Sequence, residues 1–216
     1  MSSEGVVYIV DDEEAVRRSI ARLVRSVGLR AETFPSAQAF LAQKLGDGPA
    51  CLVLDVRLPD QSGLDVQAAM GPSQRAIPII FITGRGNVPM SVRAMKEGAL
   101  DFLEKPFESE ALLECIQRAL AKSREGREVE TERAAIERRL ATLSPRERQV
   151  LALVVKGMLN KQIAGALGAA EKTIKIHRGR VMGKMDAASV AELVRMTYTV
   201  GFAPTLEFIR LPMPSQ

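Results

Sequence analysis

The chain of 216 residues contains no tryptophan, one histidine and two cysteines. The lone histidine, His177, cannot form a metal cluster, and Cys51 and Cys115 lie near apolar runs, which indicates buried, reduced thiols. No apolar run approaches the roughly 20 residues that span a bilayer. No basic and apolar signal segment opens the chain either, so we expect a cytoplasmic protein with no membrane partner.

Neither sign of charge dominates the chain, but the two signs are divided unevenly along it. Residues 1–121 carry 13 Lys and Arg against 16 Asp and Glu, a net charge of −3. Residues 143–216 carry 11 against 5, a net charge of +6. A basic C-terminal third attached to an acidic domain suggests a nucleic-acid partner at one end only.

The first part of the chain alternates apolar runs with amphipathic stretches. Strand-like runs lie at about 5–10, 30–34, 50–55, 77–82 and 100–103. Helical stretches lie near 13–27, 36–45, 63–70 and 88–98, and a further helix begins near Ser109. This alternation predicts a doubly wound α/β fold, with a five-stranded parallel sheet covered on both faces. Five strands fit the flavodoxin-like order 2-1-3-4-5.

Polar residues follow four of these strand-like runs. Asp11 and Asp12 follow GVVYIV, Asp55 follows CLVL, Thr83 follows IPIIFI, and Lys105 follows LDFLE. Polar groups at the carboxyl ends of parallel strands converge on one crevice. Three carboxylates in that crevice would repel one another without a cation, and oxygen ligands of this kind suit Mg²⁺. With a lysine nearby to hold a phosphoryl group, the pattern suggests phosphoryl transfer to a carboxylate of the protein itself.

The same residues stand in motifs of a known family. VDDEE, LDVRLPDQSG, FITGRG and DFLEKPF follow one another in this order, and residues 5–121 resemble the receiver domain of bacterial two-component response regulators. The resemblance implies that Asp55 accepts a phosphoryl group from a sensor histidine kinase. It also implies that Asp12, Asp55 and the backbone carbonyl of Arg57 bind Mg²⁺, while Asp11 acts largely through water.

The resemblance further assigns the residues that respond to phosphorylation. Thr83 would bond the phosphoryl group after it arrives, and Lys105 would pair with it. Phe102 falls at the position of the family's switch aromatic, and the Lys105–Pro106 peptide falls where the family has a cis bond. Movement of Thr83 and Phe102 would repack one face of the domain, which would then form a homodimer or release the basic domain.

The C-terminal part predicts a small all-α domain. Ser144 and Glu147 in LSPRE form a capping-box pattern at the start of a helix. Asn160 is expected to cap a short second helix, and a tight turn around Gly168 leads to a third helix over about Glu171–Met185. Two short helices joined by such a turn are typical of the helix-turn-helix motif.

This part resembles the LuxR/NarL-type DNA-binding domain over about residues 143–200. The resemblance rests on LSPRERQVLALVVKG, NKQIAGALG and EKTIKIHRGRVMGKM. Together with the receiver, it identifies the chain as a FixJ-like member of the NarL/FixJ class. Such a protein is a transcription regulator and not an enzyme. Its partners would be double-stranded promoter DNA and a second copy of itself, with RNA polymerase as a further candidate.

The third helix carries the expected contacts with DNA. Lys175 is placed to donate to guanine and Ile176 to touch a thymine methyl group. His177 is expected to pack or to contact phosphate. The remaining predicted DNA-binding residues, mainly phosphate contacts, are Lys161 in the second helix and, in the third, Lys172, Thr173, Arg178, Gly179, Arg180 and Lys184.

Several alternatives stay open. The charged segment 122–142 is either a solvated or frayed linker or a long signalling helix, and the tail 201–216 either packs back on a domain or binds a partner. The receiver could serve only to dimerise a constitutive DNA-binding protein. The C-terminal helices could instead bind protein, in which case binding would lack the steep salt dependence of DNA binding.

Overall fold

The structure is a computed structural model that describes residues 5–71, 74, 76–84 and 88–202. The chain divides into two compact units between Glu128 and Val129. Among the described residues, the N-terminal unit has an apolar core on each face of its sheet, and the C-terminal unit has a core of its own. None of the helices in these described ranges combines the length and the apolar character needed to cross a membrane.

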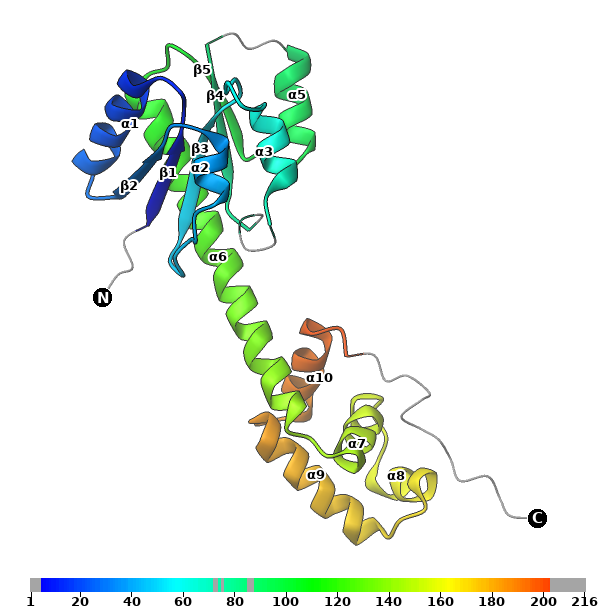
Figure 1. Cartoon of the computed structure of the whole chain (residues 1–216). Coiled ribbons are helices and arrows are strands. Elements are labelled where there is room, and N and C mark those ends of the chain that lie inside the picture. The colour runs from blue at the N-terminus through cyan, green and yellow to red at the C-terminus, as the bar shows by residue number, and fades with distance from the viewer. Residues whose placement is uncertain (1–4, 72–73, 75, 85–87, 203–216) are drawn as a thin grey trace. The chain divides into compact units, whose positions relative to one another are not determined.

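The N-terminal unit is a parallel sheet with helices on both faces (Figure 1). The strands lie in the order β2-β1-β3-β4-β5, which confirms the predicted doubly wound topology. Their bounds are β1 Val6–Val10, β2 Arg30–Phe34, β3 Ala50–Asp55, β4 Ile79–Thr83 and β5 Asp101–Glu104. The helices between and after them are α1 Glu14–Ser26, α2 Ala37–Leu41, α3 Gly63–Ala69, α5 Val88–Lys96 and α6 Ser109–Ala141.

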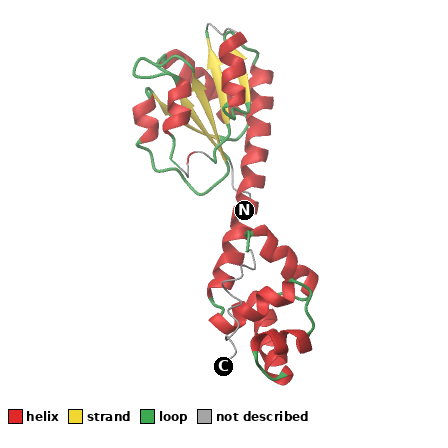
Figure 2. Ribbon diagram, turned by 90° about the vertical axis from the view of Figure 1, so that its right-hand side faces the viewer, coloured by secondary structure: helices red, strands yellow, loops and turns green. Residues whose placement is uncertain are grey.

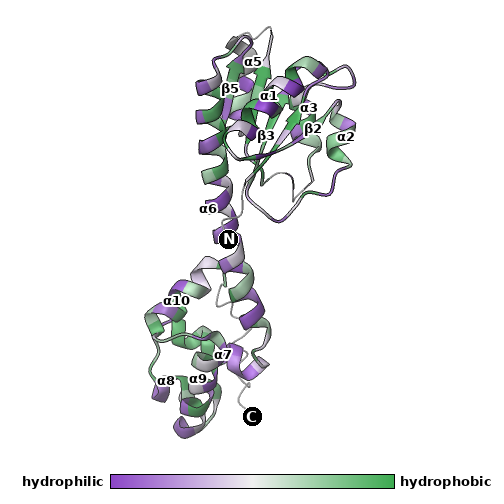
Figure 3. Ribbon diagram, turned by 90° about the vertical axis from the view of Figure 1, so that its left-hand side faces the viewer, coloured by the Kyte–Doolittle hydropathy of each residue, from purple (hydrophilic) through white to green (hydrophobic). Residues whose placement is uncertain are grey.

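Side chains of successive strand residues point to opposite faces of the sheet and build two cores. On one face, Leu52 and Phe81 lie in a core that α2, α3 and α5 complete. On the other face, Val53 and Ile80 lie in a core that α1 and the first half of α6 complete. Figure 2 shows the strands between these helices, and Figure 3 shows that the strands are largely hydrophobic. Burial on both faces explains why the strands read as continuous apolar runs.

The lengths of two helices, α2 and α6, have local explanations. α2 is capped by Ser36 and ends at Leu41, short of the predicted residue 45, ahead of a segment that contains Gly46, Gly48 and Pro49. α6 continues through Gly126 to Ala141 as one helix. A single exposed glycine costs a helix only about 1 kcal/mol relative to alanine, and strong helix formers surround it.

Up to residue 202, where the described part of the chain ends, the C-terminal unit consists of the end of α6 and four further helices. These are α7 Pro145–Val155, α8 Asn160–Leu167, α9 Glu171–Met185 and α10 Val190–Thr199. The predicted capping box is present, since Ser144 and Glu147 exchange hydrogen bonds between side chain and backbone. The turn after α8 passes through Gly168 with φ of 60°, a left-handed conformation that glycine adopts without strain.

One capping assignment was wrong. Asn160 is the first residue of α8 and not its cap; the amide of the capping residue, Leu159, donates to Gln162 instead. The Asn160 side chain is thereby free to accept a hydrogen bond from Arg178 Nη1 at 3.0 Å, which ties the start of α8 to α9. Tertiary packing therefore uses Asn160 between the helices.

The last turns of α6 belong to the core of the C-terminal unit. Ile136 and Leu140 are buried there with apolar residues of α7, α8, α9 and α10. Arg139 donates to the carbonyl of Met185 and to the carboxylate of Asp186, so it joins this end of α6 to the end of α9. Most of the predicted C-terminal tail lies outside the described residues.

Candidate functional site

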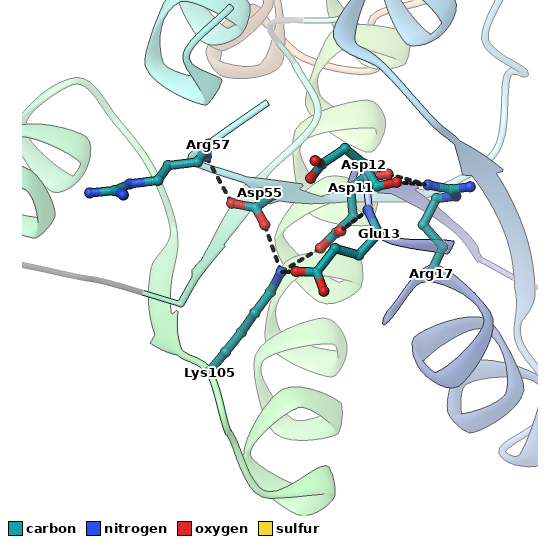
Figure 4. A network of polar contacts seen from close by, with 7 residues as sticks. All are labelled: Asp11, Asp12, Glu13, Arg17, Asp55, Arg57 and Lys105. Atoms are coloured by element: carbon teal, nitrogen blue, oxygen red, sulfur yellow. Dashed lines mark hydrogen bonds and ion pairs between the residues drawn. The ribbon is translucent and has the colours of Figure 1, made fainter. Parts of the chain in front are cut away.

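Lys105 lies between two carboxylates at the carboxyl ends of the central strands (Figure 4). Its Nζ donates to Asp11 Oδ2 and to Asp55 Oδ2, each at 2.6 Å. Asp11 comes directly after β1, Asp55 is the last residue of β3, and Lys105 comes directly after β5. The parallel sheet thus brings together residues that are 50 and 94 positions apart in the chain.

The electrostatics of this cluster follow from its burial. Burial raises the pKa of the Asp11 carboxyl above its usual value, although hydrogen bonds from Lys105 and from the Glu13 amide act in the opposite direction. Burial lowers the pKa of Lys105, but its bonds to Asp11 and Asp55 outweigh burial and raise that pKa. Lys105 therefore keeps its positive charge at neutral pH and holds the two carboxylates together.

The acidic side chains also fit a divalent cation. Carboxylate oxygens of Asp11, Asp12 and Asp55 lie within 4.8 Å of one another. Asp11 and Asp55 are buried, whereas Asp12 is exposed, so the cluster is open to solvent on one side. An all-oxygen donor set with room for water is the kind of site that Mg²⁺ takes in proteins.

The loop after β3 holds Asp55 in place. Asp55 Oδ1 accepts a hydrogen bond of 2.8 Å from the backbone amide of Arg57. The chain then folds back, and the amide of Gly63 donates to the carbonyl of Val56. A Cβ atom at Gly63 would lie 2.6 Å from the Asp55 carbonyl oxygen, so only glycine permits this close approach.

Thr83 ends the strand next to β3, and Phe102 lies further back on the edge strand β5. Thr83 is fully buried at the end of β4, and its backbone carbonyl accepts from the Lys105 amide at 2.7 Å. Phe102 is half-buried on β5, in register with Phe81 of β4, and packs against the core that contains α5. The Lys105–Pro106 peptide is cis, as the resemblance implied.

Two residues near the site were missed by sequence reasoning. Glu13 Oε1 lies 3.8 Å from the Lys105 ammonium group. Arg17 donates from Nη1 to the backbone carbonyls of Asp11 and Asp12, at 2.6 and 2.9 Å. Glu13 adjoins the acidic pair and could have been suspected, but the contact of Arg17 depends on how α1 leaves the loop.

The second candidate surface is the outer side of α9. Its inner side carries Ile174, Val181 and Met185, which are buried in the C-terminal core as predicted. Ile176 is 50% exposed. The other predicted DNA-binding residues that are exposed are Lys161 on α8 and, on α9, Lys172, Thr173, Lys175, Gly179, Arg180 and Lys184.

Two predicted phosphate contacts already have partners within the unit. Arg178 is half-buried and bonds Asn160. The Lys184 ammonium group lies 2.7 Å from Glu147 Oε2 and 3.0 Å from the carbonyl of Thr142. A phosphate at Lys184 would compete with these bonds. His177 is half-buried, and its Nδ1 atom has no hydrogen-bond partner among the described residues, which fits a packing role.

Comparison with known families finds one match in each part of the chain. Residues 7–117 match the response regulator receiver domain, and residues 141–197 match the bacterial regulatory proteins of the luxR family. The first match contains Asp11, Asp12, Asp55, Thr83 and Lys105, and the second contains α7, α8 and α9.

Similar proteins extend over nearly the whole chain. Nodulation protein W of Bradyrhizobium diazoefficiens is 48% identical over 202 residues, covering 94% of this chain and 89% of that protein. The transcriptional regulatory protein FixJ of Rhizobium meliloti is 46% identical, covering 94% of this chain and all of FixJ. The structure of the response regulator StyR is 43% identical with a TM-score of 0.81, over 90% of this chain and 98% of StyR. The chain therefore belongs to the response regulators with a receiver domain and a LuxR-type DNA-binding domain, and it is a FixJ-like transcription regulator, not an enzyme.

Proposed function

We propose that Asp55 accepts a phosphoryl group from a cognate sensor histidine kinase and that this modification switches the chain into its DNA-binding form. The observation that carries the proposal is the contact of Lys105 with both Asp11 and Asp55. A carboxylate nucleophile needs a neighbouring cation to hold the incoming phosphoryl oxygens, and Lys105 lies within hydrogen-bond distance of the acceptor. Thr83, buried on the adjacent strand, supplies a hydroxyl for the same oxygens.

Mg²⁺ is the proposed cofactor. Asp12 and Asp55 would hold it directly together with the backbone carbonyl of Arg57, and Asp11 would act largely through water. A bound Mg²⁺ supplies positive charge that offsets the charge on the transferred phosphoryl group. The support in this chain is the group of three carboxylates, whose oxygens lie within 4.8 Å of one another.

A phosphoryl group carries a charge of about −1.5 to −2, which takes the place of the single negative charge of the Asp55 carboxylate. We assign Thr83 and Phe102 as the switch residues, because Thr83 is buried at the end of β4 next to β3, and Phe102 packs on the core that includes α5. The face formed by α5, β5 and α6 is the proposed homodimer surface. Val92 and Met95 of α5 are each nearly half exposed, which gives that face apolar surface for a partner copy.

The C-terminal unit is the proposed reader of promoter DNA. Lys175 and Ile176 of α9 face solvent together and would meet base edges in the major groove.

The domain limits proposed are 5–121 for the receiver, 122–142 for the linker and 143–200 for the DNA-binding domain. The proposed location is the cytoplasm, where bacterial promoter DNA lies, and RNA polymerase is a further proposed partner.

The acceptor assignment is tested by labelling with a small phosphodonor such as acetyl phosphate. The wild type should gain one phosphoryl group in the presence of Mg²⁺, and Asp55→Asn should gain none. Asp60→Asn is the matched control, because Asp60 is an exposed carboxylate in the same loop. Labelling of Asp55→Asn at the wild-type rate would exclude Asp55 as the acceptor.

The switch is tested with beryllofluoride and Mg²⁺, since beryllofluoride stands in for a phosphoryl group on a carboxylate. The mass in solution and the affinity for selected against random duplex DNA are measured with and without it. Dimerisation together with tighter DNA binding is expected. DNA binding that is equally tight in both states would favour a constitutive regulator whose receiver only dimerises.

A further inference from the structure

We infer that Arg17 is a positioning residue for the acidic pair, acting as a clamp on the backbone of the β1–α1 loop. This inference rests on the proposed function, since it concerns how the proposed Mg²⁺ ligands are held. One guanidinium nitrogen, Nη1, donates to the carbonyl of Asp11 at 2.6 Å and to the carbonyl of Asp12 at 2.9 Å (Figure 4).

The two carbonyls belong to the backbone from which the two carboxylates extend. Each belongs to a peptide plane that adjoins Asp12, and a peptide plane moves as a rigid unit. Asp11 is further held by its side chain, which accepts from the Glu13 amide at 2.8 Å and from Lys105. No side-chain hydrogen bond of Asp12 is found among the described residues, and the backbone that Arg17 holds sets the point and direction from which this exposed side chain extends.

Arg17 is suited to this task by its place on α1. It lies in the first turns of the helix, is half-buried and points back over the loop, as Figure 4 shows. Its neighbour Arg18 is exposed and pairs with Glu14 on the helix surface at 3.4 Å. The two arginines therefore carry the same charge on the same helix, but only Arg17 donates to the loop carbonyls among the contacts of the described residues.

The clamp and simple electrostatics predict opposite effects. A positive charge beside an acidic site repels Mg²⁺, so removal of Arg17 would tighten Mg²⁺ binding if charge alone mattered. If Arg17 instead holds the ligands in place, its removal should weaken binding. Loss of a residue that orients metal ligands commonly lowers metal affinity by 10-fold or more.

The test compares Arg17→Met, Arg17→Lys and the matched control Arg18→Met in the full chain. Methionine keeps an unbranched, mostly apolar side chain and the helix propensity, and it removes the charge and the donors. Calorimetric titration with Mg²⁺ should show a dissociation constant about 10-fold higher for Arg17→Met and close to the wild type for Arg18→Met. Arg17→Lys keeps the charge and one donor group, so it should fall between them.

A second measurement separates positioning from general stability. Thermal unfolding in EDTA should differ little between Arg17→Met and Arg18→Met, and saturating Mg²⁺ should restore phosphodonor labelling of Arg17→Met. Mg²⁺ binding by Arg17→Met as tight as by Arg18→Met would overturn the clamp. Should Arg17→Met not fold, Arg17→Lys takes its place. Mg²⁺ binding by Arg17→Lys as tight as by Arg18→Met would then overturn the clamp. Absence of Mg²⁺ binding in the wild type would instead overturn the proposed metal site itself.

Discussion

At the residue scale, Lys105 is the cation that allows Asp11 and Asp55 to lie together in a buried position. Replacement by methionine leaves two buried carboxylates without a counter-charge, and loss of one partner of a buried ion pair costs about 3 kcal/mol. We therefore expect Lys105→Met to lower the unfolding temperature of the receiver in EDTA. Added Mg²⁺ should recover more stability in this variant than in the wild type.

The control for this experiment is Lys96→Met, at an exposed lysine at the end of α5. Differential scanning calorimetry with and without Mg²⁺ measures both variants. An equal response of Lys105→Met and wild type to Mg²⁺ would show that the lysine and the ion do not share the same carboxylates.

Glu147 makes the stability of the C-terminal unit depend on pH. Its hydrogen bond with Lys184 and that from the Ser144 amide lower its pKa from an ordinary 4.5 to about 2. A carboxyl group with a lowered pKa stabilises the folded state above its ordinary pKa. That stabilisation is lost as the pH falls from about 4.5 toward 2.

Glu147→Gln should therefore destabilise the unit by about 2 kcal/mol at neutral pH and remove this part of the acid sensitivity. Hydrogen exchange of peptides from α7 and α9, compared between variant and wild type at each pH, follows the effect. Glu171→Gln is the control, because Glu171 is an exposed acid at the start of α9. A constant gap between Glu147→Gln and wild type from pH 6 to pH 2.5 would contradict the assignment.

At the scale of elements, α6 contributes to the cores of both units. Leu112 and Ile116 are buried in the receiver, whereas Ile136 and Leu140 are buried in the C-terminal unit. The receiver also holds α6 by polar contacts: Ser123 accepts from the Ala50 amide, and Arg127 donates to the carbonyls of Gly46 and Asp47. The charged segment after residue 121 is therefore packed at both ends.

Ile136→Ala should cost the C-terminal unit about 3 kcal/mol, because it leaves a cavity in a packed core. Val129→Ala, seven residues earlier on the same helix, should cost well under 1 kcal/mol, because Val129 is 61% exposed. Hydrogen exchange of α7 and α9 in the full chain measures both. Equal protection in the two variants would mean that the end of α6 does not support the DNA-binding domain.

At the scale of the whole molecule, the charge is divided between an acidic receiver and a basic C-terminal part. If each copy in a dimer neutralises about three phosphates, the affinity for DNA should fall about 10³-fold between 50 and 200 mM salt. Fluorescence anisotropy of a labelled duplex measures this slope. The control is Lys156→Ala, at an exposed lysine after α7, which should leave the slope unchanged. Binding that is independent of salt would favour the alternative that the C-terminal helices bind protein.

The sequence by itself determined the topology of the receiver and the members of its acidic cluster. The apolar runs specify five buried parallel strands, and parallel strands bring the residues at their carboxyl ends to one edge. Asp11, Asp55 and Lys105 therefore had to converge, whatever the details of the loops. Periodicity in α9 likewise separated the buried Ile174 from the exposed Lys175, because a regular helix fixes which residues share a face.

Only the tertiary structure decided the contacts that depend on how elements are placed against one another. The reach of Arg17 to two loop carbonyls depends on the angle at which α1 leaves the β1–α1 loop. The engagement of Lys184 with Glu147 depends on the packing of α9 on α7. Burial of Ile136 likewise requires the C-terminal helices to cover the end of α6. Local periodicity cannot predict such contacts, because long polar side chains take their partners from whichever surface the fold brings within reach.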